Sequence, residues 1–218
     1  MNTRGAPGAV VFDFGGVLIT TIANQIGKIA ASHGVEASVM HEVLLGPRAS
    51  GDSHPWHRAE RGELALADIQ SELAPWADQH EMPLHGDEID RLLAAGEYVV
   101  VTEMVNRVRS LRADGFLTGL LTNTFAEFQP TMQRDLDFEL FDAVVESFAV
   151  GARKPEPAIY EEIESQLAVS GPEIVYLDDF DQNLVPADER GWHTILVRDP
   201  SAALSELDKL VERPTFGI

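Results

Sequence analysis

Three carboxylates, far apart along the chain, have the residue types of a divalent-metal site. Asp13 directly follows one apolar run, and Asp178 and Asp179 directly follow another. If these runs are parallel strands of one sheet, their carboxyl ends lie at the same edge and the three acids converge there. Crowded carboxylates repel one another, so the cluster needs a cation. Because the converging ligands are oxygens, Mg²⁺ is the expected cofactor.

Other polar side chains are expected at the same edge. Thr122 and Asn123 end a third apolar run, and Lys154 lies in the loop at residues 151–157. Pro157 in this loop is suited to the first turn of a helix. A hydroxyl, an amide and an ammonium group would therefore face the acids.

The elements that would position these residues alternate between strand and helix. Apolar runs predict strands at residues 9–12, 116–121, 173–177 and 193–197. Apolar residues three and four apart predict helices at residues 101–112, 157–168 and 184–190. A further amphipathic helix is expected at residues 202–211. This alternation predicts the α/β fold class, with a Rossmann-like three-layer core around a parallel sheet.

A helical insertion interrupts this pattern after the first strand. Residues 20–96 contain no convincing strand, and glycines and prolines separate four helical runs at 22–32, 39–44, 65–75 and 88–95. We therefore expect a core domain of residues 1–19 and 97–218 and an α-helical cap domain of residues 20–96. An exposed apolar face of the cap could support a homodimer.

Composition excludes several classes of partner. The 218 residues carry 16 basic and 36 acidic side chains, a net charge of −20, which repels nucleic acid. There is no cysteine, so disulfides and thiolate chemistry are excluded. No signal peptide or long apolar run is apparent, so no membrane contact and a cytoplasmic location are expected.

Four segments together carry a family resemblance. They are VFDFGGVL, LLTNT, GARKPEPAIY and VYLDDFDQNLVPADERGW, in that order. They resemble the four motifs of the haloacid dehalogenase superfamily of hydrolases, over residues 10–197. Residues 60–63 also resemble a cap element of the branch nearest the N-terminal phosphatase domain of soluble epoxide hydrolases.

The resemblance implies how a phosphoryl group would be bound and transferred. Asp13 matches the aspartate nucleophile that forms an aspartyl-phosphate. Thr122 and Asn123 match the groups that hold the phosphoryl group, with Gly16 beside them. Lys154 matches the lysine that screens the nucleophile and the phosphate oxygens.

The resemblance also implies the metal ligands. Asp13, the Gly15 carbonyl and Asp179 would ligate Mg²⁺ directly, and Asp178 would act through water. Asn183 matches a supporting residue that orients the second acid or the lysine.

One position departs from the family pattern. Family phosphatases usually carry a second aspartate two residues after the nucleophile, as the acid for the leaving group, and this chain has Gly15 there. A missing general acid costs about 10² to 10⁴ in rate, and less when the leaving group is already acidic. Glu60, Glu63, His54 or His57 could replace it.

The function implied is a Mg²⁺-dependent phosphatase of a small phosphorylated metabolite. One alternative is a metal-independent 2-haloacid dehalogenase, against which the paired acids Asp178 and Asp179 count. Another is a non-catalytic protein that binds a phosphorylated ligand, favoured by Gly15. The spacing of His54 and His57 offers no third ligand for zinc, so both are expected to be solvated or to face the substrate. Trp56 and Trp76 are expected in the cap core.

Overall fold

The core of the protein is a five-stranded, all-parallel sheet. The computed structural model describes residues 7–47, 53–93 and 98–211. The strands are β1 (Ala9–Phe12), β2 (Leu117–Thr122), β3 (Ala143–Glu146), β4 (Ile174–Asp178) and β5 (His193–Leu196). Their order in the sheet is β3-β2-β1-β4-β5, so β1 is central. The α/β fold class with a parallel sheet is confirmed.

Strand β3 is the one strand of the sheet that the sequence pattern did not predict. Its apolar residues Ala143 to Val145 are flanked by Asp142 and Glu146, and so short a run does not stand out. Pairing with β2 from Ala143 to Glu146 makes it a strand. The other four strands fall within one residue of their predicted bounds.

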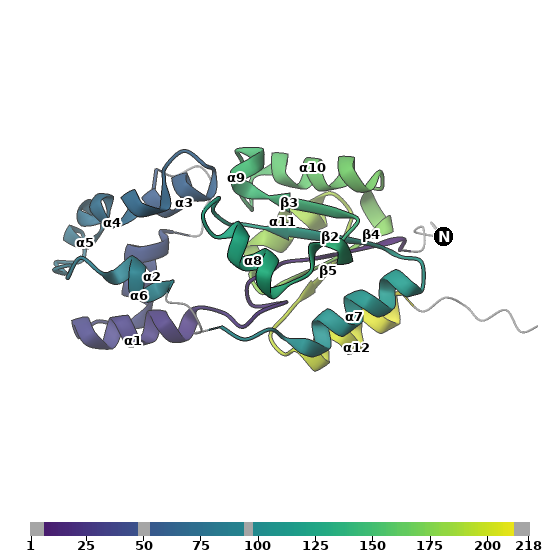
Figure 1. Cartoon of the computed structure of the whole chain (residues 1–218), viewed down its shortest axis with the longest axis horizontal. Helices are drawn as coiled ribbons and strands as arrows, with labels where there is room; N and C mark the ends of the chain where they lie inside the picture. Colours follow the sequence, from purple (N-terminus) through teal and green to yellow (C-terminus); the bar gives the residue numbers. More distant parts are fainter. Residues whose placement is uncertain (1–6, 48–52, 94–97, 212–218) are drawn as a thin grey trace, which may run out of the picture.

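Helices cover both faces of the sheet, as a three-layer core requires. Alternate residues of β1 point to opposite faces: Val10 and Phe12 pack in one apolar cluster, and Ala9 and Val11 pack in the other. The first cluster includes α7 (Thr102–Ala113) and α12 (Pro200–Val211), and the second includes α10 (Pro157–Leu167) and α11 (Asp181–Glu189). Figure 1 shows α7 and α12 together below the sheet and α10 above it. Two shorter helices, α8 (Gln129–Asp135) and α9 (Ser147–Val150), follow β2 and β3.

In the described part of residues 20–93, six helices gather at the carboxyl end of the strands, and we call them the cap helices. They are α1 (Ala23–His33), α2 (Ala37–Leu45), α3 (Pro55–Glu60), α4 (Ile69–Glu72), α5 (Ala74–Asp78) and α6 (Glu88–Leu92). They share an apolar cluster of their own, to which the core contributes Phe125. The predicted boundary at residues 96 and 97 lies outside the described residues.

Helix α3 was missed because Pro55 was interpreted as a turn signal. Pro55 instead occupies the first turn of α3, where a missing N–H is tolerated. The Nδ1 atom of His54 accepts a hydrogen bond of 3.1 Å from the Trp56 N–H and so caps the helix. The helix expected at residues 65–75 is broken into a 3₁₀ turn (Leu66–Asp68), α4 and α5.

The part of the chain that the structure describes contains no helix with both the length and the apolar character needed to cross a bilayer.

Candidate active site

Asp13 lies at the centre of the carboxyl edge of the sheet. It directly follows β1, and its N–H donates a hydrogen bond of 2.9 Å to the Leu177 carbonyl of the adjacent strand β4. Its side chain is buried but lines a cavity of about 220 Å³ between the sheet edge and the cap helices. Asp13 is therefore a fixed carboxylate at the base of a cavity.

Lys154 joins two of the three acids. Its Nζ donates to Asp13 Oδ1 at 2.7 Å and to Asp178 Oδ2 at 2.8 Å, and lies 3.0 Å from the Tyr176 hydroxyl. The side chain is 1% exposed. The ammonium group therefore supplies positive charge to two buried carboxylates that would otherwise repel each other.

The carboxylate of Asp178 is saturated with donors. Oδ1 accepts from the Phe180 N–H at 2.8 Å, and the Asn183 side-chain amide donates to both oxygens at 3.1 Å. Oδ2 also accepts from Lys154 and from the Tyr176 hydroxyl. Such an acid has little capacity left for a metal ion, which supports the prediction that it acts through water.

Asp179 has the opposite character. Its Oδ1 is buried and has no hydrogen-bond partner among the described residues. Ligand atoms of Asp13, Asp178 and Asp179 lie within 4.8 Å of one another. A buried, unpartnered carboxylate oxygen beside two more acids fits a hard divalent cation.

Burial and the charges of neighbouring groups shift the pKa values of Asp13, Asp179 and Lys154. Burial raises the pKa of Asp13 to about 7, although Lys154 lowers it. Burial and the negative charges of Asp13 and Asp178 raise the pKa of Asp179 to about 8. Burial lowers the pKa of Lys154, but the two carboxylates beside it outweigh burial and raise it. Lys154 alone does not offset the burial of Asp13 and Asp179, and a cation would favour the charged forms of these two acids.

The two glycines after Asp13 differ in the space around them. A Cβ atom at Gly16 would lie 2.1 Å from Asp179 Oδ2, and the φ angle of Gly16 is +78°. Gly16 therefore allows Asp179 to approach the loop, a role not expected from the sequence. A Cβ atom at Gly15 would meet nothing within 4 Å, so the backbone does not require glycine there.

The remaining predicted residues lie around Asp13 and Lys154. Thr122, the last residue of β2, and Asn123 both line the cavity. The side-chain amide of Asn123 donates to the Lys154 carbonyl at 3.1 Å and accepts from the Lys154 N–H at 2.8 Å. Asn123 therefore also holds the loop that carries Lys154.

Tyr176 was not predicted as a site residue, although it contacts Lys154 and Asp178. Its hydroxyl donates to Asp178 and lies next to the Lys154 ammonium. The signal was available, because residues two apart in a strand point to the same face, and Tyr176 is two residues before Asp178.

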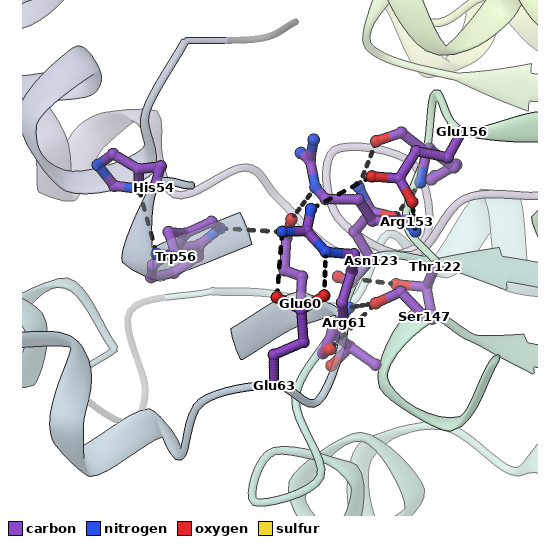
Figure 2. Close-up of polar contacts among 12 residues, drawn as sticks. His54, Trp56, Glu60, Arg61, Glu63, Thr122, Asn123, Ser147, Arg153 and Glu156 are labelled. Carbon is purple, nitrogen blue, oxygen red and sulfur yellow. Dashed lines mark hydrogen bonds and ion pairs between the residues drawn. The ribbon is translucent and has the colours of Figure 1, made fainter. Parts of the chain in front are cut away.

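Among the described residues of the cap helices, Glu60 is the acid that lines the cavity. Glu60 accepts from the Trp56 ring N–H at 2.9 Å and from Nε of Arg153 at 2.5 Å. Figure 2 shows Glu60 between these two partners. Glu63 lies on the exposed side instead, where it pairs with Arg61 at 2.8 Å. Glu60 therefore lines the cavity, whereas Glu63 does not.

His54 and His57 are buried, so the expectation that they are solvated is wrong. His54 is 0% exposed and His57 is 2% exposed. His54 bonds to the Val43 carbonyl and the Trp56 N–H, while His57 lines the cavity. Trp56 packs in the core of the cap helices as expected, and the half-buried Trp76 ring contacts His54.

The structure combines a parallel α/β sheet with a cluster of three acids at its carboxyl edge. A sequence model of the haloacid dehalogenase-like hydrolases matches residues 7–184. The chain belongs to this family and is a hydrolase.

Curated relatives include larger proteins. The mouse acyl-CoA dehydrogenase family member 10 is 30% identical over 94% of this chain, and the rat bifunctional epoxide hydrolase 2 is 39% identical over 49% of it. The chain spans 19% and 20% of the lengths of these two relatives. The sesquiterpene phosphatase astK of Aspergillus oryzae is 27% identical, over 93% of this chain and 96% of its own length.

Solved structures share the fold. A predicted haloacid dehalogenase-like hydrolase from Porphyromonas gingivalis has a TM-score of 0.71 at 24% identity, covering 96% of this chain and all of the other. A family enzyme from Bacteroides thetaiotaomicron, in complex with magnesium and inorganic phosphate, has a TM-score of 0.61 at 19% identity, covering 89% of this chain and 95% of the other.

Proposed function

We propose that this protein is a Mg²⁺-dependent phosphatase that uses Asp13 as nucleophile. The observation that carries the proposal is the placement of Asp13 at the base of the cavity. The Lys154 ammonium contacts it, and a carboxylate oxygen of Asp179 lies within 4.8 Å of its ligand atom. Oδ1 of Asp179 is buried without a hydrogen-bond partner among the described residues. The relative described as a phosphatase supports the same activity.

The residues around Asp13 have separate roles in this reaction. An Asp13 oxygen attacks phosphorus, the bond to the leaving group breaks, and water then hydrolyses the aspartyl-phosphate. Lys154 holds Asp13 in position and balances charge on the phosphoryl oxygens. Thr122 and Asn123 offer a hydroxyl and an amide to the same oxygens.

The metal ion would be held by residues of the loop after β1 and by residues at the end of β4. Asp13, Asp179 and the Gly15 carbonyl would hold Mg²⁺, and Asp178 would act through water. When bound, the ion would screen the negative charge of the substrate from that of the acids.

The cavity favours a substrate with an apolar organic part. Beyond the polar base, its walls are mostly aliphatic and aromatic, and include Ile19, Ile22, Leu45, Trp56, Leu92, Phe125 and Phe128. The relative described as a sesquiterpene phosphatase supports an apolar phosphorylated compound. We further propose that residues 20–96 form a cap domain that covers this substrate.

The two alternatives predict different assays. A 2-haloacid dehalogenase would release halide from chloroacetate without metal. The donors around Asp178 and the unpartnered oxygen of Asp179 are not needed for that reaction, so they favour the phosphatase. A non-catalytic protein would be stabilised by phosphorylated ligands without turning them over.

The first prediction concerns the metal. We expect hydrolysis of p-nitrophenyl phosphate in Mg²⁺, loss of activity with a chelator, and recovery when Mg²⁺ is restored. Mg²⁺ at 100 times its dissociation constant should also stabilise the fold by about 2.7 kcal/mol, measured by thermal unfolding. Inactivity toward a broad panel of phosphorylated compounds in Mg²⁺, including acyl phosphates, would contradict the proposal.

The second prediction concerns the loop after Asp13. In Gly16→Ala, the new Cβ atom would collide with Asp179, so we expect Mg²⁺ affinity to fall about 10- to 100-fold by calorimetric titration. Gly34→Ala is the matched control, because Gly34 has a φ angle of +70° but open space around its Cβ position. Equal Mg²⁺ affinity in both variants would show that Asp179 does not hold the ion.

A further inference from the structure

Arg153 is a buried cation with no role in the scheme above. It precedes Lys154, is 7% exposed, and lines the same cavity as Asp13. Its Nε donates to Glu60 Oε2 at 2.5 Å, but its Nη1 is buried and has no hydrogen-bond partner among the described residues. A charged donor buried in this way is suited to a negatively charged oxygen of a ligand.

Glu60 fixes where this donor lies. Both oxygens of Glu60 accept hydrogen bonds, one from Trp56 and one from Arg153 (Figure 2). The guanidinium is therefore held at its Nε by a residue of the cap helices, while its Nη1 has no hydrogen-bond partner among the described residues. Both oxygens of Glu60 are therefore engaged by Trp56 and Arg153.

The direction of the reaction decides which part of the substrate Arg153 would meet. Asp13 attacks from the sheet edge, and in an in-line displacement the leaving oxygen departs on the opposite side. That side is covered by the cap helices, to which Glu60 ties Arg153. Gly15 supplies no proton on this side, so the leaving group has to depart as an anion or find another donor.

We propose that Arg153 binds the leaving-group oxygen and selects substrates whose leaving group is a stable oxyanion. This inference rests on the proposed phosphatase function. These substrates share a phosphoryl group attached to the oxygen of an acidic leaving group, as in an organic diphosphate or an acyl phosphate. Arg153 then takes the place of the missing acid by stabilising charge rather than by donating a proton.

The bonds balance without an added acid. An Asp13 oxygen forms a bond to phosphorus, and the bond from phosphorus to the leaving oxygen breaks. The leaving group keeps the electron pair as an organic monophosphate or a carboxylate. Water then attacks the aspartyl-phosphate, restores the Asp13 carboxylate and leaves as dihydrogen phosphate with both of its protons.

The test compares leaving groups rather than total activity. We would measure kcat/KM in Mg²⁺ for aryl phosphates of graded leaving-group acidity, for an alkyl diphosphate, and for an acyl phosphate of equal chain length. The wild-type rate should rise with leaving-group acidity. In Arg153→Met we expect kcat/KM to depend more steeply on leaving-group acidity, and to fall by about 10²-fold on the preferred substrate. Arg153→Lys, which keeps the charge, should recover part of the loss.

Two further variants serve as controls. Arg61→Met removes a nearby arginine that pairs with Glu63 and Glu156 but does not line the cavity, so it should leave the dependence unchanged. If Arg153→Met does not fold because Glu60 is left unpaired, Glu60→Leu with Arg153→Met removes both charges. That double variant should show the same steeper dependence.

Gly15→Asp adds the acid that this chain lacks. The space at Gly15 is open, so we expect a folded protein. Its rate on alkyl monophosphates should rise by about 10²-fold, and its dependence on leaving-group acidity should become flatter. Arg153→Met should instead make the dependence of the rate on leaving-group acidity steeper.

The outcomes separate this inference from the proposed function. The wild-type protein could hydrolyse aryl phosphates while Arg153→Met lowers kcat/KM for all of them by the same factor. In that case Arg153 has only a structural role and the inference is wrong. A flat wild-type dependence would mean that a donor such as His57 protonates the leaving group, which also overturns it. Inactive wild-type protein would overturn both. A preference for the diphosphate or for the acyl phosphate supports the inference and identifies the source of the oxyanion.

Discussion

Asp13→Asn is expected to lose at least about 10⁴-fold in phosphatase turnover. The asparagine amide has nearly the same shape, but its oxygen is a poor nucleophile and cannot form the acyl-phosphate bond. Rapid acid quenching with labelled substrate should trap the aspartyl-phosphate in the wild-type protein and not in the variant.

The same variant should remain folded. Asp13 is a buried carboxylate whose pKa burial raises to about 7, so its charge is costly in this site. Lys154 keeps its second partner, Asp178. We therefore expect a thermal midpoint equal to or above that of the wild-type protein. The control is Asp114→Asn, an exposed acid at the end of α7 that should keep full activity. Substantial turnover by Asp13→Asn would exclude Asp13 as the nucleophile.

Lys154→Met is expected to affect both stability and activity. Without the ammonium, two buried carboxylates lose their shared cation, which costs about 3–5 kcal/mol in the free energy of unfolding. Turnover should fall by at least about 10²-fold, because a group that stabilises the transferring phosphoryl charge is lost. Denaturant unfolding in chelator and initial rates in Mg²⁺ would measure the two effects.

The loss of stability should depend on the metal. Since a divalent cation can replace part of the missing positive charge, Mg²⁺ should stabilise Lys154→Met more than it stabilises the wild-type protein. Lys209→Met, on the exposed face of α12, is the matched control and should change stability little. If Lys154→Met unfolds like the wild-type protein in chelator, the carboxylates around Lys154 are not charged as the site requires.

Much of the core was predictable because its signals are local. The apolar runs that became β1 and β4 are fully buried in the sheet, and the polar residues at the run ends converge on one edge. Parallel strands explain why Asp13 and Asp178, distant in sequence, both contact Lys154. Strand β3 was not predictable in this way, because its three apolar residues become a strand only by pairing with β2.

The cap helices were less predictable because their contacts are not local. His54 caps the helix that Pro55 begins, and Glu60 pairs with Arg153 of the core. The pairing of Glu60 with Arg153 joins residues 93 positions apart. Neither residue carries a periodic signal that would indicate this contact.

The sequence by itself determined the alternation of strands and helices in the core, apart from β3, the residue types at the sheet edge, and the absence of an acid at Gly15. Those properties depend on burial patterns and on side-chain chemistry, which can be assigned without coordinates. Only the tertiary structure decided that Tyr176 joins the network, and that Oδ1 of Asp179 and Nη1 of Arg153 are buried without a partner among the described residues. These depend on distances between side chains from different elements, which packing of the cap helices against the sheet edge sets.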